Sequence, residues 1–321
     1  MCEMTNVSPR GRISPKCAGM WSDENEAALK RVHDFCRTYG VAKLGVQLAH
    51  AGRKGPTTPP AAGGKPILSE AEGGWTPEAP SAISYDTGWP VPHAMTREDI
   101  KRCVGEFAAA AKRVDRIGYD VIELHGGHGY LLHQFMSPLS NQRSDEYGGS
   151  HENNARYPLE VFRAIREVWP ADKPMSVRLS CHDWTEGGNT PADAAIYAKM
   201  FKAAGADLID CSSGQVSKAE KPVYGRLFQT PFSDKLRNEI GIATVAVGAI
   251  SEADHANSII AAGRADLCAI ARPHLADAAW TLHEAAKIGM KSIAWPKQYL
   301  SGKLQYETNL ARTAATAPAP G

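Results

Sequence analysis

The sequence predicts an α/β protein built on a parallel sheet, and its 321 residues fit a single barrel of alternating strands and helices. Between residues 43 and 273 an amphipathic helix, a small turn, a short apolar run and a polar loop recur in that order. The apolar runs are nearly continuous, which is typical of parallel strands buried on both faces. We therefore expect a TIM (β/α)8-type barrel.

Six apolar runs are the candidate strands. They read KLGVQL, DVIELH, MSVRLS, DLIDCS, ATVAVG and DLCAIA. Three of these runs follow turns that begin at Gly118, Gly205 and Gly263. Glycine accepts the left-handed conformation that closes a helix, so each of these glycines marks the end of a helix and the entry to the next strand.

The helices between the strands carry start signals. A Ser or Thr with an acidic residue three positions later can form a capping box, in which each residue satisfies a free backbone N–H of the other. Three pairs have this spacing: Thr96 with Asp99, Thr190 with Asp193, and Ser251 with Asp254.

Two segments depart from the alternation. Residues 54–94 are rich in proline and glycine and form a long loop after the first candidate strand. Loops of this length are usually functional or disordered. Residues 311–321 are poor in bulky apolar side chains, so we expect a disordered tail there. The expected organisation is one domain over residues 1–310, followed by that tail.

Composition excludes several classes of partner. The chain has 36 Lys and Arg against 35 Asp and Glu, so no overall field attracts nucleic acid or an anionic membrane. No apolar run reaches the roughly 20 residues of a membrane span, and the first residues lack the order of a signal peptide. The seven cysteines are scattered singly, which indicates reduced thiols. We expect a cytoplasmic protein that acts on a small molecule.

Polar residues gather where the candidate strands end. In a parallel barrel those ends converge on one face, where active sites lie. The residues are Gln47, His50, His125, His128, Arg178, Ser212, Ser213, Gly214, Gly248 and Arg272. A bland alternative is that polarity rises wherever a strand becomes a loop. After the last two strands, Gly248 with Ala249 and Ala271 with Arg272 have the composition of a phosphate site, because a glycine admits an anion to the backbone and arginine adds charge.

One stretch concentrates unusual side chains, with His125, His128, Tyr130 and His133 within nine residues. Metal ligation, a site that polarises a substrate and donates a proton, and a polar loop over a core are three interpretations. The usual helical zinc motif spaces its histidines four apart around a glutamate. Here the spacing between His125 and His128 is three, across a Gly-Gly turn, so we expect no metal.

The ordered blocks QLAHAGRK, APSAI, HGGHGYLLHQFMSPLSNQRSDEYGGSHENNAR, VRLS, IDCSSG and GRADLCAIARPHL span most of the chain. From about Met4 to about Tyr299 they resemble the signature blocks of the old yellow enzymes, FMN-dependent NAD(P)H oxidoreductases and ene-reductases on an eight-stranded α/β barrel. The resemblance implies FMN as cofactor and NAD(P)H as hydride donor. It implies an unsaturated carbonyl compound or CoA thioester as substrate.

The resemblance also implies roles for individual residues. His125 and His128 would bind the substrate's carbonyl oxygen, and Tyr130 would deliver a proton to the α-carbon. Gln47 would bond the pyrimidine side of the flavin, and Arg178 would lie beside N1 and the C2 carbonyl. The backbone of Met4 would touch the flavin. The expected phosphate-binding residues are Gly248, Ala249, Ala271 and Arg272.

Two of the chain's departures from the family pattern bear on the barrel and on the phosphate site. The family's barrel begins with a strand and helix, and its second strand ends near a segment like Glu3-Met4-Thr5. The resemblance therefore implies that the first strand and most of the second are missing from this chain. In addition, Ala271 stands where relatives usually have glycine.

A second resemblance gives an alternative. KPVYGRLFQTPFSDKLRNE and ARPHLADAAW are similar to the C-terminal half of fused flavoproteins that hydroxylate aromatic CoA thioesters, such as salicylyl-CoA 5-hydroxylase. On this alternative the chain is a reductive or scaffold module. Homo-oligomerisation and covalent fusion to an upstream flavoprotein domain are both open as partnerships.

Overall fold

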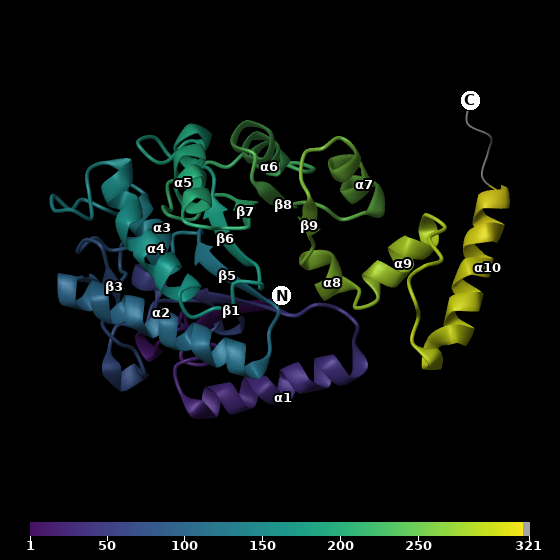
Figure 1. Cartoon of the computed structure of the whole chain (residues 1–321), viewed down its shortest axis with the longest axis horizontal. Helices are drawn as coiled ribbons and strands as arrows, with labels where there is room; N and C mark the ends of the chain where they lie inside the picture. The colour runs from purple at the N-terminus through teal and green to yellow at the C-terminus, as the bar shows by residue number, and fades with distance from the viewer. Residues whose placement is uncertain (317–321) are drawn as a thin grey trace.

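The computed structural model describes residues 1–316, and its centre is a curled parallel sheet (Figure 1). The sheet order is β1-β2-β5-β6-β7-β8-β9, so its neighbours follow chain order. The strands are β1 (Cys2–Asn6), β2 (Gly45–Ala49), β5 (Val121–Gly126), β6 (Met175–Ser180), β7 (Leu208–Ser212), β8 (Ala243–Val247) and β9 (Leu267–Ala269). Every pairing is parallel, and β1 and β9 form the two edges within the described residues.

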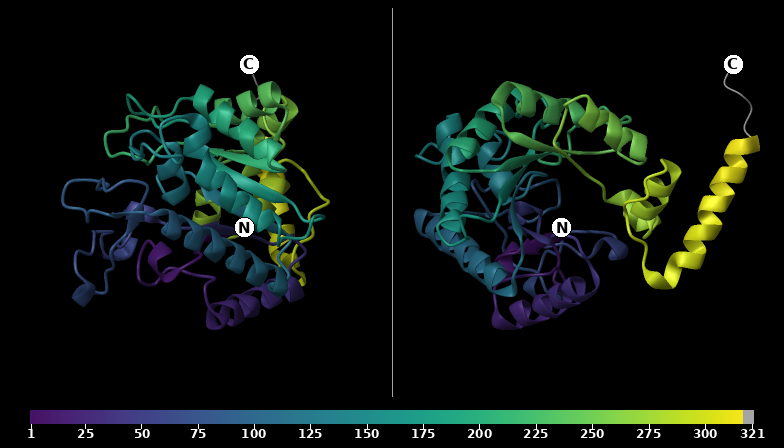
Figure 2. Two further views of the ribbon diagram at one scale, coloured as in Figure 1. Left: turned by 60° about the vertical axis from the view of Figure 1, so that its left-hand side comes forward. Right: turned by 45° about the vertical axis from the view of Figure 1, so that its right-hand side comes forward.

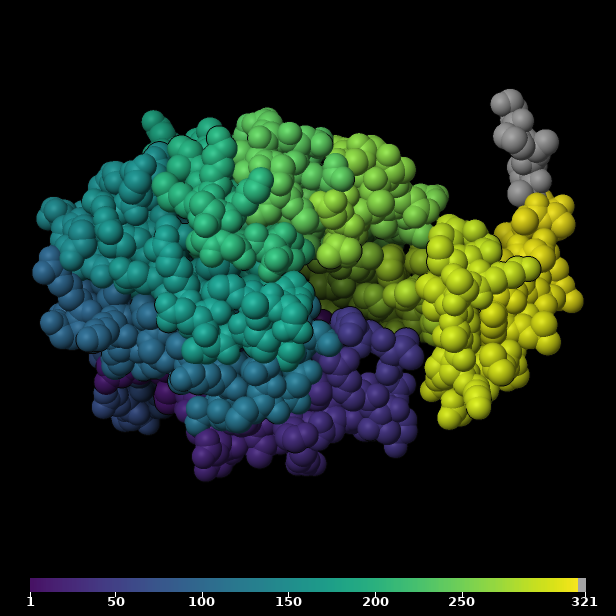
Figure 3. Space-filling model, viewed as in Figure 1, coloured from purple at the N-terminus to yellow at the C-terminus, as the bar shows by residue number. Residues whose placement is uncertain are grey.

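Helices cover the outside of the curled sheet, and α1, α2, α4 and α5 pack against one another in chain order. The helices are α1 (Asp23–Tyr39), α2 (Arg97–Ile117), α3 (Leu131–Met136), α4 (His151–Arg166), α5 (Pro191–Ala203), α6 (Thr230–Lys235), α7 (Ala253–Ala261), α8 (Arg272–Ala276), α9 (Trp280–Lys287) and α10 (Leu300–Thr316). The right-hand view of Figure 2 shows the open, curved arrangement, with α10, in yellow, at the outer end. The space-filling view is hollowed between the α7 and α1 regions (Figure 3).

Two apolar clusters hold these layers together. The large one joins β1, β2, β5, β6 and β7 to the inner faces of α2, α4 and α5, through side chains such as Phe107, Phe162 and Phe201. A small one lies around β8 and α7 and includes Ala246 and Ile259. Burying a large apolar side chain contributes about 1.5–3 kcal/mol. Because the large cluster buries many more such side chains than the small one, the β1 to β7 half of the sheet is the better packed half.

The predicted strands are all present, but the count of six is wrong, because the structure adds β1. Met4 pairs with Gln47 and Asn6 with Ala49, so β1 runs beside β2 along most of its length. The segment CEMTN contains no apolar run, and the six strands were counted from apolar runs, so this segment was not among them.

Two of the three predicted capping boxes are confirmed, at Thr96 with Asp99 and at Thr190 with Asp193. The third is wrong. The N-cap of α7 is Glu252 rather than Ser251, and it makes no side-chain cap hydrogen bond. The Ser251 backbone is engaged elsewhere, since its carbonyl accepts a hydrogen bond from Trp280 Nε1 at 3.1 Å.

The long loop is present as predicted, whereas the C-terminal segment is partly helical rather than disordered. Residues 54–94 form a loop that carries only short helical turns and a pairing of β3 (Glu78–Ala79) with β4 (His93–Ala94). Of the expected disordered tail, residues 311–316 instead continue helix α10, and residues 317–321 lie outside the described part. Within residues 1–316, no helix has the length and hydropathy needed to cross a membrane.

Candidate functional site

The ends of strands β5 to β9 open into one cavity of about 820 Å³. Its walls come from the segments that follow these strands, which a parallel sheet brings to one face. Six of the predicted site residues line it: His128, Arg178, Gly248, Ala249, Ala271 and Arg272. Ser212, Ser213 and Gly214, which were noted at the end of β7, also line it.

The predicted residues on β1 and β2, Met4 and Gln47, do not line this cavity but lie side by side on neighbouring strands. Met4 pairs with Gln47, and Gln47 pairs with Glu123 on β5, so the three residues cross the sheet side by side. The Gln47 side chain is buried and donates from Nε2 to Glu123 Oε1 at 2.7 Å. Ser176 on β6 donates to the other oxygen of Glu123 at 3.1 Å. Glu123 therefore anchors the amide of Gln47.

Arg178 lies in the next row, between His125 and Asp210. Its Nε is 3.4 Å from Asp210 Oδ2 but makes no hydrogen bond, and this buried Nε has no partner among the described residues. Burial, followed by the nearby Glu123 carboxylate, raises the pKa of Asp210 to about 7, while Arg178 acts to lower it. Arg178 thus places a positive charge at the cavity wall, and its Nε–H makes no hydrogen bond within the described residues.

The histidine loop after β5 is held by a directional chain of hydrogen bonds. The Gly127 N–H donates to His125 Nδ1 at 3.3 Å, so His125 carries its proton on Nε2. That proton points to His128 Nδ1 at 3.3 Å, which leaves the His128 proton on Nε2, 2.6 Å from Ser212 Oγ. The two imidazoles are therefore both neutral, and His128 presents its N–H at the cavity.

Burial keeps these groups neutral. Burial is the main cause that lowers the pKa of both His125 and His128 well below the ordinary value, and the charge of Arg178 acts on both in the same direction. Burial raises the pKa of Tyr130 to about 12. Near pH 7 the loop therefore offers two neutral imidazoles and a protonated phenol. The His125 and Tyr130 rings meet edge to face, with centroids 5.0 Å apart.

Lys54 was not predicted as a site residue, yet it ties the loop to its surroundings. Its Nζ donates to the carbonyls of His128 at 2.8 Å and Gln215 at 3.1 Å. It also lies 5.0 Å from the centre of the Tyr130 ring and 4.9 Å from that of Tyr85. Burial lowers the pKa of Lys54 to about 7, so its charge near the phenol is sensitive to pH near neutrality.

On the far side of the cavity, the β8 loop forms a concave backbone. Gly248 and Ala249 both have positive φ, at 107° and 53°. A Cβ on Gly248 would lie 2.6 Å from Gln229 Nε2, so only glycine fits. Gln229 also accepts a hydrogen bond from Ser213 Oγ at 2.6 Å, which links this loop to the end of β7. Ala271 is the N-cap of α8, and Arg272 is exposed beside it.

Sequence reasoning missed Glu123, Asp210, Trp184 and Gln229. Glu123 and Asp210 did leave a signal, because each is a charged residue inside an apolar strand run. Trp184 lines the cavity and stacks flat on His182, with centroids 4.4 Å apart, but no spacing marked it. Within the described residues, no group of three or more His, Cys, Asp or Glu side chains could hold a metal ion.

Comparison with known proteins defines the class. The sequence model of the NADH:flavin oxidoreductase / NADH oxidase family matches residues 1–290. The chain belongs to this family, which includes the old yellow enzymes, and it is therefore an oxidoreductase.

Among its relatives, the NADPH dehydrogenase of Bacillus velezensis is 43% identical over 297 residues, which cover 92% of this chain and 82% of the relative. A 2-naphthoyl-CoA reductase in complex with 2-naphthoyl-CoA has a TM-score of 0.78 at 25% identity, over 88% of this chain and 44% of that one. Morphinone reductase in complex with tetrahydroNAD has a TM-score of 0.70 at 26% identity, over 88% of this chain and 77% of that one. These relatives do not favour the fused hydroxylase alternative.

The family binds FMN and takes electrons from NAD(P)H, and the cavity fits this cofactor. The Nε of Arg178 is buried without a hydrogen bond within residues 1–316, and its ionic contact with Asp210 is long at 3.4 Å, so Arg178 offers positive charge at the cavity wall. At the other end, Gly248 and Arg272 both line the same cavity. A cavity lined by two arginines is suited to an anionic cofactor.

Proposed function

We propose that this oxidoreductase reduces the activated C=C bond of an unsaturated carbonyl compound or CoA thioester with NAD(P)H as electron donor. The observation that carries the proposal is that His128 and Arg178 line one cavity, while the ring of His125 packs against the rings of both His128 and Tyr130. FMN supplies the hydride chemistry when bound.

In this proposal the two imidazoles bind the substrate oxygen. Negative charge develops on that oxygen as the β-carbon accepts a hydride, and donors already in place stabilise it most in the transition state. His128 Nε2–H faces the cavity and now meets Ser212, so a substrate oxygen has to take the place of the Ser212 hydroxyl. His125 has to exchange its contact with His128 Nδ1 for the same oxygen.

Tyr130 completes the reduction as general acid. The α-carbon needs one proton, and a phenol whose pKa lies near 12 holds its proton at neutral pH. The carbanion-like carbon is a stronger base than the phenolate, so the transfer runs downhill. Lys54, 5.0 Å from the ring centre, stabilises the phenolate that remains.

The remaining predicted residues hold the cofactor. Gln47 and the backbone of Met4 would contact the flavin ring from β2 and β1, and Arg178 would lie beside its pyrimidine edge. Gly248, Ala249, Ala271 and Arg272 would bind the phosphate. Residues 1–310 would act as one FMN-binding domain. Support comes from the cavity, since one 820 Å³ space joins Arg178 to the Gly248 and Arg272 walls.

The substrate class is supported by relatives of different kinds. One similar structure is a reductase with 2-naphthoyl-CoA, and another is morphinone reductase. Both names describe a conjugated carbonyl group, which is the group that two hydrogen-bond donors and one acid can polarise.

The test uses purified protein with FMN, first checked for a yellow, stoichiometrically bound cofactor. Anaerobic NADPH oxidation is then followed with 2-cyclohexen-1-one and with crotonyl-CoA. We expect alkene-dependent turnover, and Tyr130→Phe should lower kcat for the alkene by about 10²-fold because one general acid is lost.

The matched control is Tyr39→Phe, since Tyr39 is an exposed tyrosine on α1, far from the loop in the chain. It should leave turnover unchanged. The proposal fails if FMN binds but neither alkene accelerates NADPH oxidation over the alkene-free rate. It also fails if Tyr130→Phe reduces both alkenes as fast as the wild type.

A further inference from the structure

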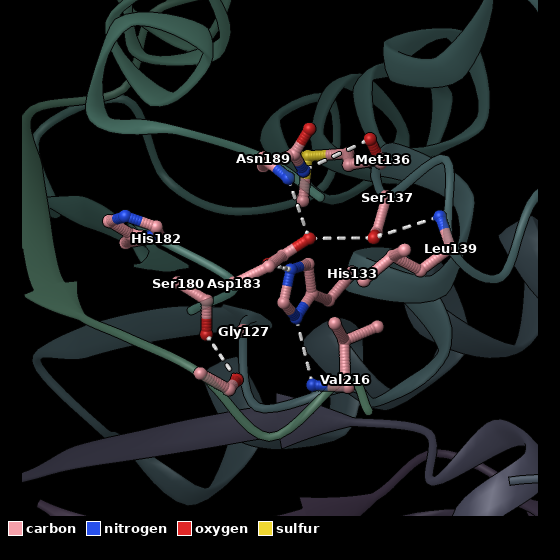
Figure 4. Close-up of polar contacts among 12 residues, drawn as sticks. Gly127, His133, Met136, Ser137, Leu139, Ser180, His182, Asp183, Asn189 and Val216 are labelled. Carbon is pink, nitrogen blue, oxygen red and sulfur yellow. Dashed lines mark hydrogen bonds and ion pairs between the residues drawn. The ribbon is translucent and has the colours of Figure 1, made fainter. Parts of the chain in front are cut away.

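A third histidine of this stretch, His133, lies behind the site and pairs with an aspartate. His133 Nε2 is 2.9 Å from Asp183 Oδ1, and both side chains are almost completely buried (Figure 4). His133 is on α3, and Asp183 lies in the loop after β6. Neither residue lines the cavity or takes part in the proposed chemistry. The role of this buried, hydrogen-bonded pair is therefore not explained by the proposed function.

The carboxylate of Asp183 is fixed from its other side as well. Its Oδ2 accepts hydrogen bonds from Ser137 Oγ at 2.7 Å and from the Asn189 N–H at 2.9 Å (Figure 4). Asp183 N–H donates in turn to the Asn189 carbonyl at 2.8 Å. The carboxylate therefore has no freedom to rotate, and it presents Oδ1 to His133 as an acceptor only.

The other nitrogen of His133 holds the catalytic loop. The backbone N–H of Gly129 donates to His133 Nδ1 at 2.8 Å. A nitrogen that accepts this bond carries no proton, so the His133 proton is on Nε2 and donates to Asp183. Asp183 thus selects the one tautomer of His133 that can accept from Gly129.

We propose that His133 and Asp183 are a positioning pair that sets the geometry of His128 and Tyr130 through Gly129. The inference rests on the proposed function, because it gives a purpose to the placement of those two residues. Gly129 is the residue between His128 and Tyr130 and has φ of 69°, and the backbone of Gln215 lies so close that a Cβ on Gly129 would be 2.2 Å from its carbonyl oxygen. A loop in this conformation keeps its shape only when both sides hold it.

Asp183→Asn tests the pair with almost no change in size. The amide can donate to His133, and a donor there favours the opposite tautomer, whose Nδ1–H would face the Gly129 N–H. We expect kcat for 2-cyclohexen-1-one to fall by about 30- to 100-fold, as for a misplacement of about 1 Å. The Kd for FMN should change less than about three-fold, since the cofactor walls are elsewhere.

The chain supplies a matched control in a second His–Asp pair. His151 Nε2 lies 2.8 Å from Asp193 Oδ1, but this pair is partly exposed and holds helix α5 rather than the loop. Asp193→Asn should cost stability and leave kcat unchanged. If both variants lower kcat equally, the effect of Asp183→Asn is general destabilisation and the inference is wrong.

Nitrogen NMR of protein labelled with 15N-histidine tests the inference without any turnover. We expect His133 of the wild type to show an unprotonated Nδ1 and a protonated Nε2, with the pattern reversed in Asp183→Asn. A wild-type His133 protonated on Nδ1 overturns the inference outright, even if the variants do not fold. A wild type that reduces no alkene, yet shows the expected tautomer, refutes the proposed function and leaves the tautomer assignment standing.

Discussion

Replacement of Gly129 by alanine should displace the catalytic loop. Gly129 has φ of 69°, and a left-handed conformation costs an alanine about 1–2 kcal/mol. The larger effect is steric. A Cβ there would lie 2.2 Å from the Gln215 carbonyl oxygen and 2.7 Å from Val216 Cα, and both contacts are backbone. An ordinary contact needs about 3.4 Å, so the loop has to retreat by about 1 Å, and a displacement of this size costs about 10²-fold in rate.

The assay compares kcat/KM for 2-cyclohexen-1-one in Gly129→Ala and in Gly149→Ala. Gly149 also has positive φ, 95°, but a Cβ there meets nothing within 4 Å. Both variants therefore place an alanine at positive φ, and only Gly129→Ala also brings a Cβ against neighbouring backbone. We expect similar losses of thermal stability from the strain and a loss of activity in Gly129→Ala alone. Equal activity in the two variants would refute the reasoning.

Three further predictions concern stability. Gly105 lies inside α2 with open space around it, so Gly105→Ala should raise the unfolding free energy by about 0.5–1 kcal/mol in urea denaturation. Thr190→Ala breaks the capping box with Asp193 and should lower it by about 1 kcal/mol by the same measurement. Burial and Glu123 raise the pKa of Asp210 to about 7, so the folded chain binds this proton more tightly than the unfolded chain, and stability falls as the pH rises from about 4 to 7. In the apoprotein, Asp210→Asn should gain stability over the wild type as the pH rises from about 5 to about 8, and a constant difference would contradict this.

The fold was largely predictable because its signals are local. Continuous apolar runs marked six strands, and Gly118, with φ of 101°, closes α2 as expected. Strand β1 has no apolar run and so was not counted among the six, although the family resemblance placed the end of a strand near Glu3-Met4-Thr5. The start of α7 was mistaken for a similar reason. Ser251 has the right spacing, but its backbone is bonded to a distant tryptophan, and spacing does not reveal tertiary contacts.

For the site as well, local signals were predictable and tertiary contacts were not. Strand ends predicted which residues share a face, and His128, Arg178 and Arg272 do line one cavity. The partners that orient such residues were not predictable, because a single aspartate or lysine carries no periodic signal. Asp183 and Lys54 acquire their roles only when loops separated by 50 or more residues meet.

The shape of the histidine loop depends on other strand ends as well as on its own sequence. Ser180 at the end of β6 accepts from the His128 N–H at 2.8 Å. Lys54, after β2, donates to the His128 carbonyl, and His133 accepts from Gly129. Each tether comes from a different segment, so no one of them can shift without pulling on the others. Sequences that keep the HGGHGY motif but lose these tethers should therefore keep the chemical groups and lose their alignment, which is the quantity that catalysis by positioning requires.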